Sequence, residues 1–214
     1  MKFCVIGLGR FGYQTAMSLA SHGMEVFAVD NNEEIVESIR DKVTQSVCFR
    51  IDSEEDLRAL GIDEMDAVIV GMGESFEESI IVSALLKKNL GIKYVIARAR
   101  NKIHENILRL VGVDKVIMPE QDSGIRLASS LSLKYLDFTP ITDDFSITQI
   151  TAPTSFISKT LAELQLRKSR NVSCIAIHKE DSLQLVSLEY VIKEGDILVL
   201  SGNNKDLASL KSGL

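Results

Sequence analysis

A glycine-rich loop near the start of the chain has the spacing of a phosphate-binding turn. Gly7, Gly9 and Gly12 form the pattern G-x-G-x-x-G between an apolar run and an amphipathic stretch. Gly7 would permit a tight turn, Gly9 would let phosphates approach the backbone, and Gly12 would let the following helix pack closely. Free N–H groups and the positive end of the helix dipole attract anions. The loop therefore predicts a nucleotide-phosphate site.

An aspartate follows the next predicted strand at the position expected of a ribose ligand. Asp30 lies 18 residues beyond Gly12, close to the usual spacing of about 20 residues. Its carboxylate can accept hydrogen bonds from a ribose diol and would repel a 2′-phosphate, which disfavours NADP and leaves NAD, ATP, ADP or AMP. The simpler alternative is a tight turn in which Asp30 caps the next helix, but the combined pattern favours nucleotide binding.

An arginine lies inside the glycine loop, at the first turn of the predicted helix. A cation is mildly unfavourable beside the positive end of a helix dipole. Arg10 would be suited instead to a terminal phosphate, which its guanidinium can bind through paired hydrogen bonds. A solvated arginine is the alternative interpretation.

A site of this kind is held by a sheet and its helices, and the first 118 residues alternate short apolar runs with amphipathic stretches. Strands are predicted at residues 2–6, 25–29, 46–49, 67–70, 94–97 and 115–118. Helices are predicted at residues 10–21, 32–42, 54–60, 74–90 and 104–111. Strands that are apolar throughout are typical of a parallel sheet covered on both faces. We therefore expect the α/β class, with a Rossmann-type doubly wound sheet.

The pattern changes after Pro119. Residues 123–136 predict one amphipathic helix, whose candidate buried positions are Ile125, Leu127, Ala128, Leu131 and Leu133. A turn-rich linker is expected at 139–144, strands at 146–151, 172–178, 183–187 and 197–201, and helices only at 159–164 and 205–210. We expect a nucleotide-binding domain at 1–120, a connecting and dimerisation helix at 121–138, and a small α+β domain at 139–214.

Composition excludes several classes of protein. A net charge of -6 argues against non-specific nucleic-acid binding and against a polybasic membrane-surface protein. The start of the chain is unlike a signal sequence, and no apolar run is long enough to span a membrane. Cys4, Cys48 and Cys174 lie in apolar runs, which predicts reduced core cysteines, and the three histidines lack zinc-ligand spacing.

No catalytic set accompanies the predicted nucleotide site. The chain has no Tyr-x-x-x-Lys pattern, and the predicted second domain contains one histidine, His178. We therefore expect that the protein has no catalytic residues. The second domain is expected to act as a sensor or as an assembly module. A small NAD-dependent oxidoreductase is the alternative, because catalytic groups need not be adjacent in the chain.

Several motifs along nearly the whole chain resemble the RCK/KTN family, which comprises regulatory subunits of potassium transporters and gating domains of related channels. They are VIGLGRFG at 5–12, VD at 29–30, RIDSEEDLRALGI at 50–62, DAVIVGMGE at 66–74, ARARN at 97–101, LVGVDKVIMPEQDSG at 110–124 and VIKEGDILVLSG at 191–202. One copy of each family domain in a chain of this size resembles a Ktr-type subunit.

The resemblance implies a set of site residues. The phosphates would contact the glycine loop and Arg98. The ribose would contact Asp30, and the adenine would lie near Asp52 and Ser53. The complete implied set is Gly7, Leu8, Gly9, Arg10, Phe11, Gly12, Asp30, Asn31, Asp52, Ser53, Gly71 and Arg98. Glu120 would help hold a divalent cation, Mg²⁺ or Ca²⁺, beside the terminal phosphate. The alternatives are a surface salt bridge for Arg98 and a helix-dipole carboxylate for Glu120.

The resemblance also implies ligands and partners. ATP/ADP or NAD(H) would bind, and Arg10 favours ATP/ADP. Subunits would pair and form a ring, probably of eight chains, in the cytoplasm beneath a potassium-translocating membrane subunit. The expected function is nucleotide-dependent gating, and a regulator of another partner is a further alternative. The absence of a proline in residues 185–189 argues against a cyclic di-AMP site, although basic residues at 167–170 leave it open.

Overall fold

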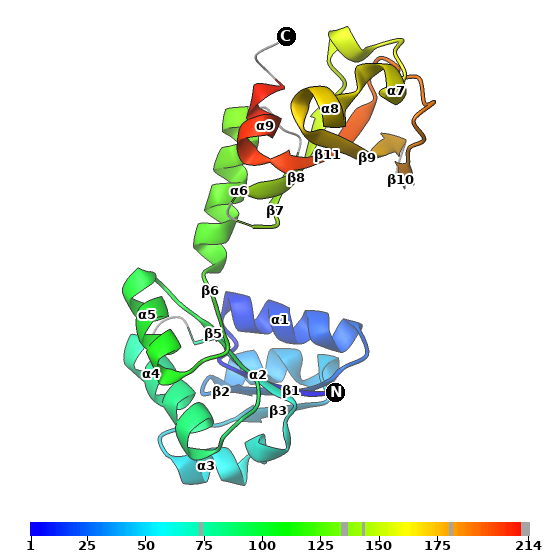
Figure 1. Cartoon of the computed structure of the whole chain (residues 1–214). Coiled ribbons are helices and arrows are strands. Elements are labelled where there is room, and N and C mark those ends of the chain that lie inside the picture. Colours follow the sequence, from blue (N-terminus) through cyan, green and yellow to red (C-terminus); the bar gives the residue numbers. More distant parts are fainter. Residues whose placement is uncertain (73–74, 134–136, 143, 180–181, 211–214) are drawn as a thin grey trace. The chain divides into compact units, whose positions relative to one another are not determined.

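The chain folds into two compact units. The computed structural model describes residues 1–72, 75–133, 137–142, 144–179 and 182–210, and the units are Met1–Pro119 and Glu120–Leu214 (Figure 1). Among the described residues, no helix combines the length and apolar character that crossing a membrane requires.

The first unit is built on a six-stranded parallel sheet in the order β3-β2-β1-β4-β5-β6. Its strands are β1 Lys2–Ile6, β2 Glu25–Asp30, β3 Gln45–Cys48, β4 Ala67–Val70, β5 Val95–Arg98 and β6 Lys115–Ile117. Its helices are α1 Arg10–Ser21, α2 Glu33–Ile39, α3 Glu54–Ala59, α4 Phe76–Ala84 and α5 Lys102–Val111. The strand order reverses between β1 and β4, so the predicted Rossmann-type doubly wound sheet is confirmed.

Alternation along β1 explains how helices cover both faces of this sheet. Cys4 and Ile6 are buried in the cluster that contains Leu57 of α3 and Leu108 of α5. Val5, between them, is buried in the opposite cluster, with residues of α1 and α2. Because successive side chains of a strand point to opposite faces, one apolar run serves two cores.

Some predicted boundaries in the first unit differ from the structure. The long helix predicted at 74–90 is α4, followed by a π-helical turn at Leu85–Asn89, and Glu74 lies outside the described residues. α5 begins at Lys102, two residues earlier than predicted, because the Asn101 side chain accepts a hydrogen bond from the His104 N–H at 2.9 Å.

The cysteine prediction holds for one residue and fails for another. Cys4 is fully buried, and burial raises the pKa of its thiol to about 12. Cys174 is partly buried, and burial raises its pKa to about 11. Cys48 is exposed, which contradicts the expected core position. It ends the edge strand β3, which has a neighbouring strand on one side only.

The second unit contains a helix and an antiparallel sheet in the order β10-β9-β11-β8-β7. Its strands are β7 Asp137–Pro140, β8 Phe145–Thr151, β9 Val172–Lys179, β10 Ser182–Leu185 and β11 Ile197–Asn203. Its helices are α6 Pro119–Leu133, α7 Leu161–Leu164, α8 Leu166–Arg170 and α9 Asn204–Ser209. The expected small α+β unit is confirmed.

Two elements of the second unit were not predicted. Residues 137–140 form β7, although 139–144 was expected to be a linker, because Phe138 is buried in the core and β7 pairs with β8. The short helix α8 was also missed, since a single turn with one buried residue, Leu166, has no helical periodicity.

The long helix α6 exposes four of the apolar side chains that the structure describes. Ile125, Leu127, Ala128 and Leu131 were expected to be buried, but all four are exposed. The side chain of Leu133 and residues 134–136 at the predicted end of the helix lie outside the described residues.

Candidate functional site

The carboxyl ends of the central strands bring the predicted site residues to one edge of the sheet. Gly7 follows β1 and Gly71 follows β4, the two strands between which the order reverses. The Gly7 N–H donates to the Val29 carbonyl at 2.8 Å, and the Gly71 N–H donates to the Ile6 carbonyl at 2.7 Å. Ligands of doubly wound sheets bind in the crevice at this switch point.

Three of the glycines at this edge are required by packing alone. A Cβ atom on Gly12 would lie 1.9 Å from the Gly7 carbonyl oxygen, and one on Gly71 would lie 2.7 Å from the same atom. Gly7 has a φ of +87°, and a Cβ there would lie 2.8 Å from the Met72 nitrogen. These glycines let the two loops and α1 meet closely, as the motif predicts for Gly7 and Gly12.

Gly9 differs from those three glycines. Its φ of −61° is open to any residue, and a Cβ built on it would meet no atom within 4 Å among the residues that the structure describes. Neither backbone strain nor packing within the chain therefore requires a glycine at this position. Open space at the start of a helix fits a ligand that approaches the backbone closely, so the residues present fit a nucleotide phosphate.

The N-terminus of α1 is also unlike those of the neighbouring helices. Gly9 occupies its cap position and provides no side-chain hydrogen bond, and the first turn contains no acidic residue. By contrast, α2, α3, α4 and α5 are capped by the side chains of Asn32, Ser53, Ser75 and Asn101. The twelve-residue helix α1 thus presents its dipole to open space, with the exposed Arg10 in its first turn.

The two remaining loop residues contribute to the core of the first unit. Leu8 is 2% exposed and Phe11 is partly buried, and both belong to the cluster that contains α1 and α2. Their side chains anchor the loop, so any contact that they make with a phosphate would come from the backbone.

Asp30 connects the glycine loop to the end of β2. One carboxylate oxygen accepts from the Leu8 N–H at 2.5 Å, and the other accepts from the Asn32 N–H at 2.9 Å. Asp30 is not the cap of α2, because Asn32 accepts from the Glu34 and Ile35 N–H groups instead. Each carboxylate oxygen has two lone pairs, so capacity remains for a ribose hydroxyl.

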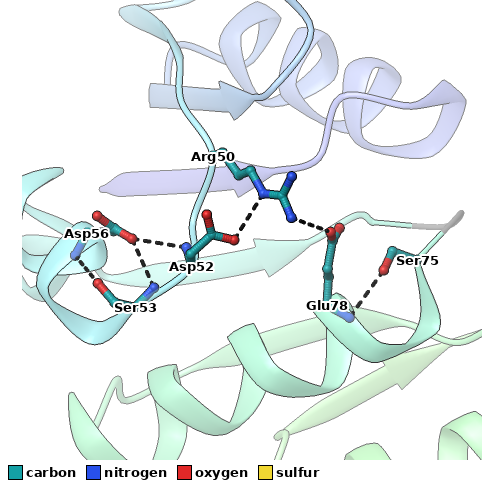
Figure 2. A network of polar contacts seen from close by, with 6 residues as sticks. All are labelled: Arg50, Asp52, Ser53, Asp56, Ser75 and Glu78. Carbon is teal, nitrogen blue, oxygen red and sulfur yellow. Dashed lines mark hydrogen bonds and ion pairs between the residues drawn. The ribbon is translucent and has the colours of Figure 1, made fainter.

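The structure gives the two predicted adenine neighbours other partners. The Ser53 hydroxyl accepts from the Asp56 N–H at 3.2 Å, and the Asp56 carboxylate accepts from the Ser53 N–H at 2.9 Å. This capping box begins α3. The Asp52 carboxylate lies 3.0 Å from Nε of Arg50 (Figure 2). Asp52 therefore forms an ion pair and Ser53 caps a helix, and the place of both residues near the adenine stays a prediction.

The sequence interpretation missed Arg50. This residue follows β3 and lies between two carboxylates, Asp52 at 3.0 Å and Glu78 of α4 at 3.7 Å (Figure 2). The hydrogen bond to Asp52, with the charges of Asp52 and Glu78, raises the pKa of Arg50. Arg50 follows the carboxyl end of β3, at the same edge of the sheet at which Asp30 ends β2, and that placement is the signal that could have found it.

The remaining predicted residues are Arg98, Asn31 and Glu120. Arg98 ends β5 and is partly buried. Asn31 is exposed beside Asp30. Glu120 is exposed in the first turn of α6, within the second unit. Across the described part of the chain, no group of three or more His, Cys, Asp or Glu residues is placed to hold a metal ion. The metal role of Glu120 stays a prediction.

Comparison with known proteins identifies both units. Residues 3–119 match the TrkA-N domain, and residues 147–212 match the TrkA-C domain. The chain is 36% identical to Ktr system potassium uptake protein A of Bacillus subtilis (strain 168), over 96% of this chain and 93% of that protein. It is 31% identical to the protein of the same name from Vibrio alginolyticus, over 99% of this chain and 97% of that protein. Both are potassium uptake proteins, which agrees with the expectation that the chain is not an enzyme.

Solved structures show the same fold. The GsuK RCK domain matches with a TM-score of 0.68 at 20% identity, over 99% of this chain and 47% of that chain. The GsuK channel bound to NAD matches with a TM-score of 0.57 at 22% identity, over 99% of this chain and 38% of that chain. The chain thus spans less than half of each of those chains. With a TrkA-N and a TrkA-C domain in one chain, the protein belongs to the RCK/KTN family.

Proposed function

We propose that this protein is a nucleotide-sensing regulatory subunit of a potassium uptake system. The observation that carries the proposal is the open space at Gly9, before the uncapped and acid-free start of α1 and beside Asp30. The full-length similarity to Ktr potassium uptake proteins supplies the physiological context.

The proposed ligand is an adenine nucleotide, either ATP/ADP or NAD(H). GsuK, a protein of the same fold, has been solved bound to NAD and bound to ADP. The phosphates would bind the Gly7–Gly12 loop, with Arg98 close by, and the ribose would bind Asp30 and Asn31. Arg10 favours the ligand with the additional phosphate, because its exposed guanidinium lies at the helix end that such a phosphate approaches.

The proposed assembly is a homo-oligomer beneath a potassium-translocating membrane subunit, at the cytoplasmic face. The exposed apolar side chains of α6 support a dimerisation role for residues 121–138, because large exposed apolar residues mark interfaces. Paired subunits would form an octameric ring, and Glu120 would help hold Mg²⁺ or Ca²⁺ at the phosphates. The ring would change shape only if its conformations bind the nucleotide with different affinity.

The sharpest test of the nucleotide site is the substitution Gly9→Ala. The added methyl group meets no atom of the described residues, so the free energy of unfolding should change by less than about 1 kcal/mol. The same methyl group would occupy the space of the bound phosphate and should weaken ATP, ADP and NAD binding at least about tenfold, the scale of one lost charged hydrogen bond. Calorimetric titration measures the affinities, and thermal unfolding measures the stability.

The matched control is Gly12→Ala. Its methyl group would lie 1.9 Å from the Gly7 carbonyl oxygen, so we expect a loss of more than about 3 kcal/mol of stability. Gly9→Ala protein that binds every nucleotide as tightly as the native protein would show that the open space is not a phosphate site. Steady oxidation of NADH with a carbonyl substrate would favour the oxidoreductase alternative.

A further inference from the structure

A short segment between the end of β3 and the start of α3 lies along α4. We call this segment, residues 50–54, the strap. At one end of the strap, Nη2 of Arg50 lies 3.7 Å from the carboxylate of Glu78, in the first turn of α4 (Figure 2). At the other end, the Glu54 carboxylate accepts a hydrogen bond of 2.7 Å from the side chain of Asn89, in the π-helical turn that follows α4. The strap therefore contacts both ends of one helical segment.

The length of the strap fits an extended chain with a buried centre. Between the two contacts the helix advances about 16 Å, at about 1.5 Å per residue. The four residue steps of the strap span at most about 14 Å when extended, and the side chains at its ends cover the remainder. In the middle, Ile51 is 7% exposed and belongs to the core cluster that contains Val82 of α4. The centre of the strap is thus held by burial, and its ends are held by polar contacts.

The two ends of the strap are held with different strength. At the far end, Glu54 binds both Asn89 at 2.7 Å and Arg58 at 2.8 Å. At the near end, the ion pair is longer, and the side chains of Arg50 and Glu78 are 66% and 42% exposed. Exposed ion pairs contribute little to stability and are screened by salt. The Arg50 end is therefore the one that can release while the fold is retained.

The Arg50 end lies next to the proposed nucleotide site. The Phe49 N–H donates to the Asp30 carbonyl at 2.8 Å, so the residue before Arg50 is joined to the predicted ribose ligand. Glu78 lies in the first turn of α4, shortly after Gly71 at the switch point of the sheet. The ion pair thus connects the segment that follows β3 with the segment that follows β4.

We propose that the Arg50–Glu78 ion pair is a clasp that bound nucleotide closes, and that it transmits the presence of nucleotide to the start of α4. The inference rests on the proposed nucleotide site. A ligand that contacts Asp30 restricts the motion of Phe49 and of Arg50 after it, which lowers the entropic cost of forming the pair. Linkage makes the effect reciprocal, so the clasp must strengthen nucleotide binding by the factor by which the nucleotide strengthens the clasp. The expected factor is about two- to fivefold, the range of an exposed ion pair.

The test compares the native chain with Glu78→Gln, which keeps the shape of the side chain and removes its charge. Glu77→Gln is the matched control, because Glu77 is exposed in the same turn but points about 100° away around the helix. Calorimetry measures ATP affinity, and amide hydrogen exchange measures the protection that ATP adds to residues 75–80. Glu78→Gln should weaken ATP about two- to fivefold and reduce the added protection by a similar factor. The control should match the native chain in both measurements.

A double-mutant cycle assigns the effect to the pair. Arg50→Gln combined with Glu78→Gln should lose little more ATP affinity than Arg50→Gln alone, because one interaction cannot be removed twice. Additive losses would overturn the clasp, as would native affinity and native protection in Glu78→Gln. An equal loss in Glu77→Gln would also overturn it, because the effect would then follow net charge. A native chain that binds no nucleotide would instead refute the proposed function, and the clasp with it.

Discussion

The helices of the first unit begin in two different ways. α2, α3, α4 and α5 each start with a side chain that accepts a hydrogen bond from the first turn. α1 starts at Gly9, which has no side chain to offer, and no acidic residue lies in its first turn. Within the described residues of the first unit, α2, α3, α4 and α5 therefore close their own N-termini and α1 does not.

This difference indicates which helix receives a ligand. Loss of a side-chain cap typically costs about 1 kcal/mol, and α2, α3, α4 and α5 each have such a cap. At α1 the chain instead leaves open space beside Gly9 and places Asp30 within hydrogen-bonding distance of the loop. An anionic ligand would complete this N-terminus, as the caps complete the others.

The largest effect on nucleotide binding is expected when Asp30, which contacts the loop at the uncapped start of α1, is replaced. Replacement by alanine removes the predicted ribose acceptor and should weaken ATP and NAD binding by about 1.5–3 kcal/mol. Replacement by asparagine keeps one oxygen acceptor without the charge, so the preference for NAD over NADP should fall. Fluorescence or calorimetric titration with the four nucleotides ATP, ADP, NAD and NADP provides the measurement.

The matched control for Asp30 lies at the start of the neighbouring helix α2. Asn32→Ala removes a side-chain cap and should lower stability without a comparable change in affinity. Native-like affinity in Asp30→Ala would refute the ribose assignment.

The closed N-terminus of α5 predicts a pH dependence of stability. His104 is fully buried there, its Nδ1 accepts from the Arg100 N–H at 3.3 Å, and its ring lies 4.6 Å from that of Phe76. Burial, with a smaller contribution from the charge of Arg100, lowers the pKa of His104 below 6.5. The folded chain therefore favours the neutral ring, and the unfolded chain binds the proton more readily.

The sign of the His104 effect follows from linkage. Its contribution is complete above about pH 6.5 and is lost as pH falls from there toward the lower pKa of the folded state, by at most about 1.4 kcal/mol per pH unit. Urea unfolding at pH 7.5 and 5.5 measures it. His104→Phe should reduce the difference between the two pH values, and His22→Phe, at an exposed position, should preserve it. An unchanged pH dependence in His104→Phe would assign the effect to other groups.

A smaller effect is expected at the capped start of α3. Ser53→Ala removes the acceptor of the capping box and should lower the free energy of unfolding by about 1 kcal/mol. The contact between Ser53 and adenine stays a prediction that the same variant tests, because a hydroxyl that accepts from the Asp56 N–H keeps its own hydrogen to donate. Ser53→Thr, which retains a hydroxyl, is the control. A loss of ATP affinity in the alanine variant would support the expected contact between Ser53 and adenine, and native affinity would refute it.

The sequence was informative where periodicity and spacing are strong. The strands at 2–6 and 67–70 and the helix at 10–21 have the predicted bounds, because long apolar or amphipathic runs determine both type and length. β7 was missed because Asp137, Thr139 and Pro140 surround its single buried residue, Phe138. An edge strand tolerates proline and exposes much of its surface, so its pattern is weak.

The candidate site was predictable to a similar, partial extent. The glycine motif and Asp30 were found because their spacing is fixed by the turn and the adjacent strand. The capping role of Ser53 was visible in the stretch Ser53-Glu54-Glu55-Asp56, which has the pattern of a capping box, but the place near the adenine was implied by the family resemblance alone. Arg50 was missed because its ion pair with Glu78 joins residues far apart in sequence.

The smallest binding effect, and the most direct test of regulation, is expected at Arg10. This arginine is exposed at the start of α1, where Gly9 provides no side-chain cap. An exposed charge contributes about 0.3–1 kcal/mol, so Arg10→Glu should reduce the ratio of ATP to ADP affinity about two- to fivefold. Since ligands shift a conformational equilibrium only through differential affinity, the ratio of potassium flux in saturating ATP to that in saturating ADP should also move toward one. Reconstitution with the membrane partner measures that flux, and Arg40→Glu, at an exposed arginine on the far end of α2, controls for the change of net charge. Assembly, followed by light scattering, should be affected less than the flux ratio. If Arg10→Glu keeps the native flux ratio, Arg10 does not sense the terminal phosphate, and the open start of α1 binds nucleotide without distinguishing ATP from ADP.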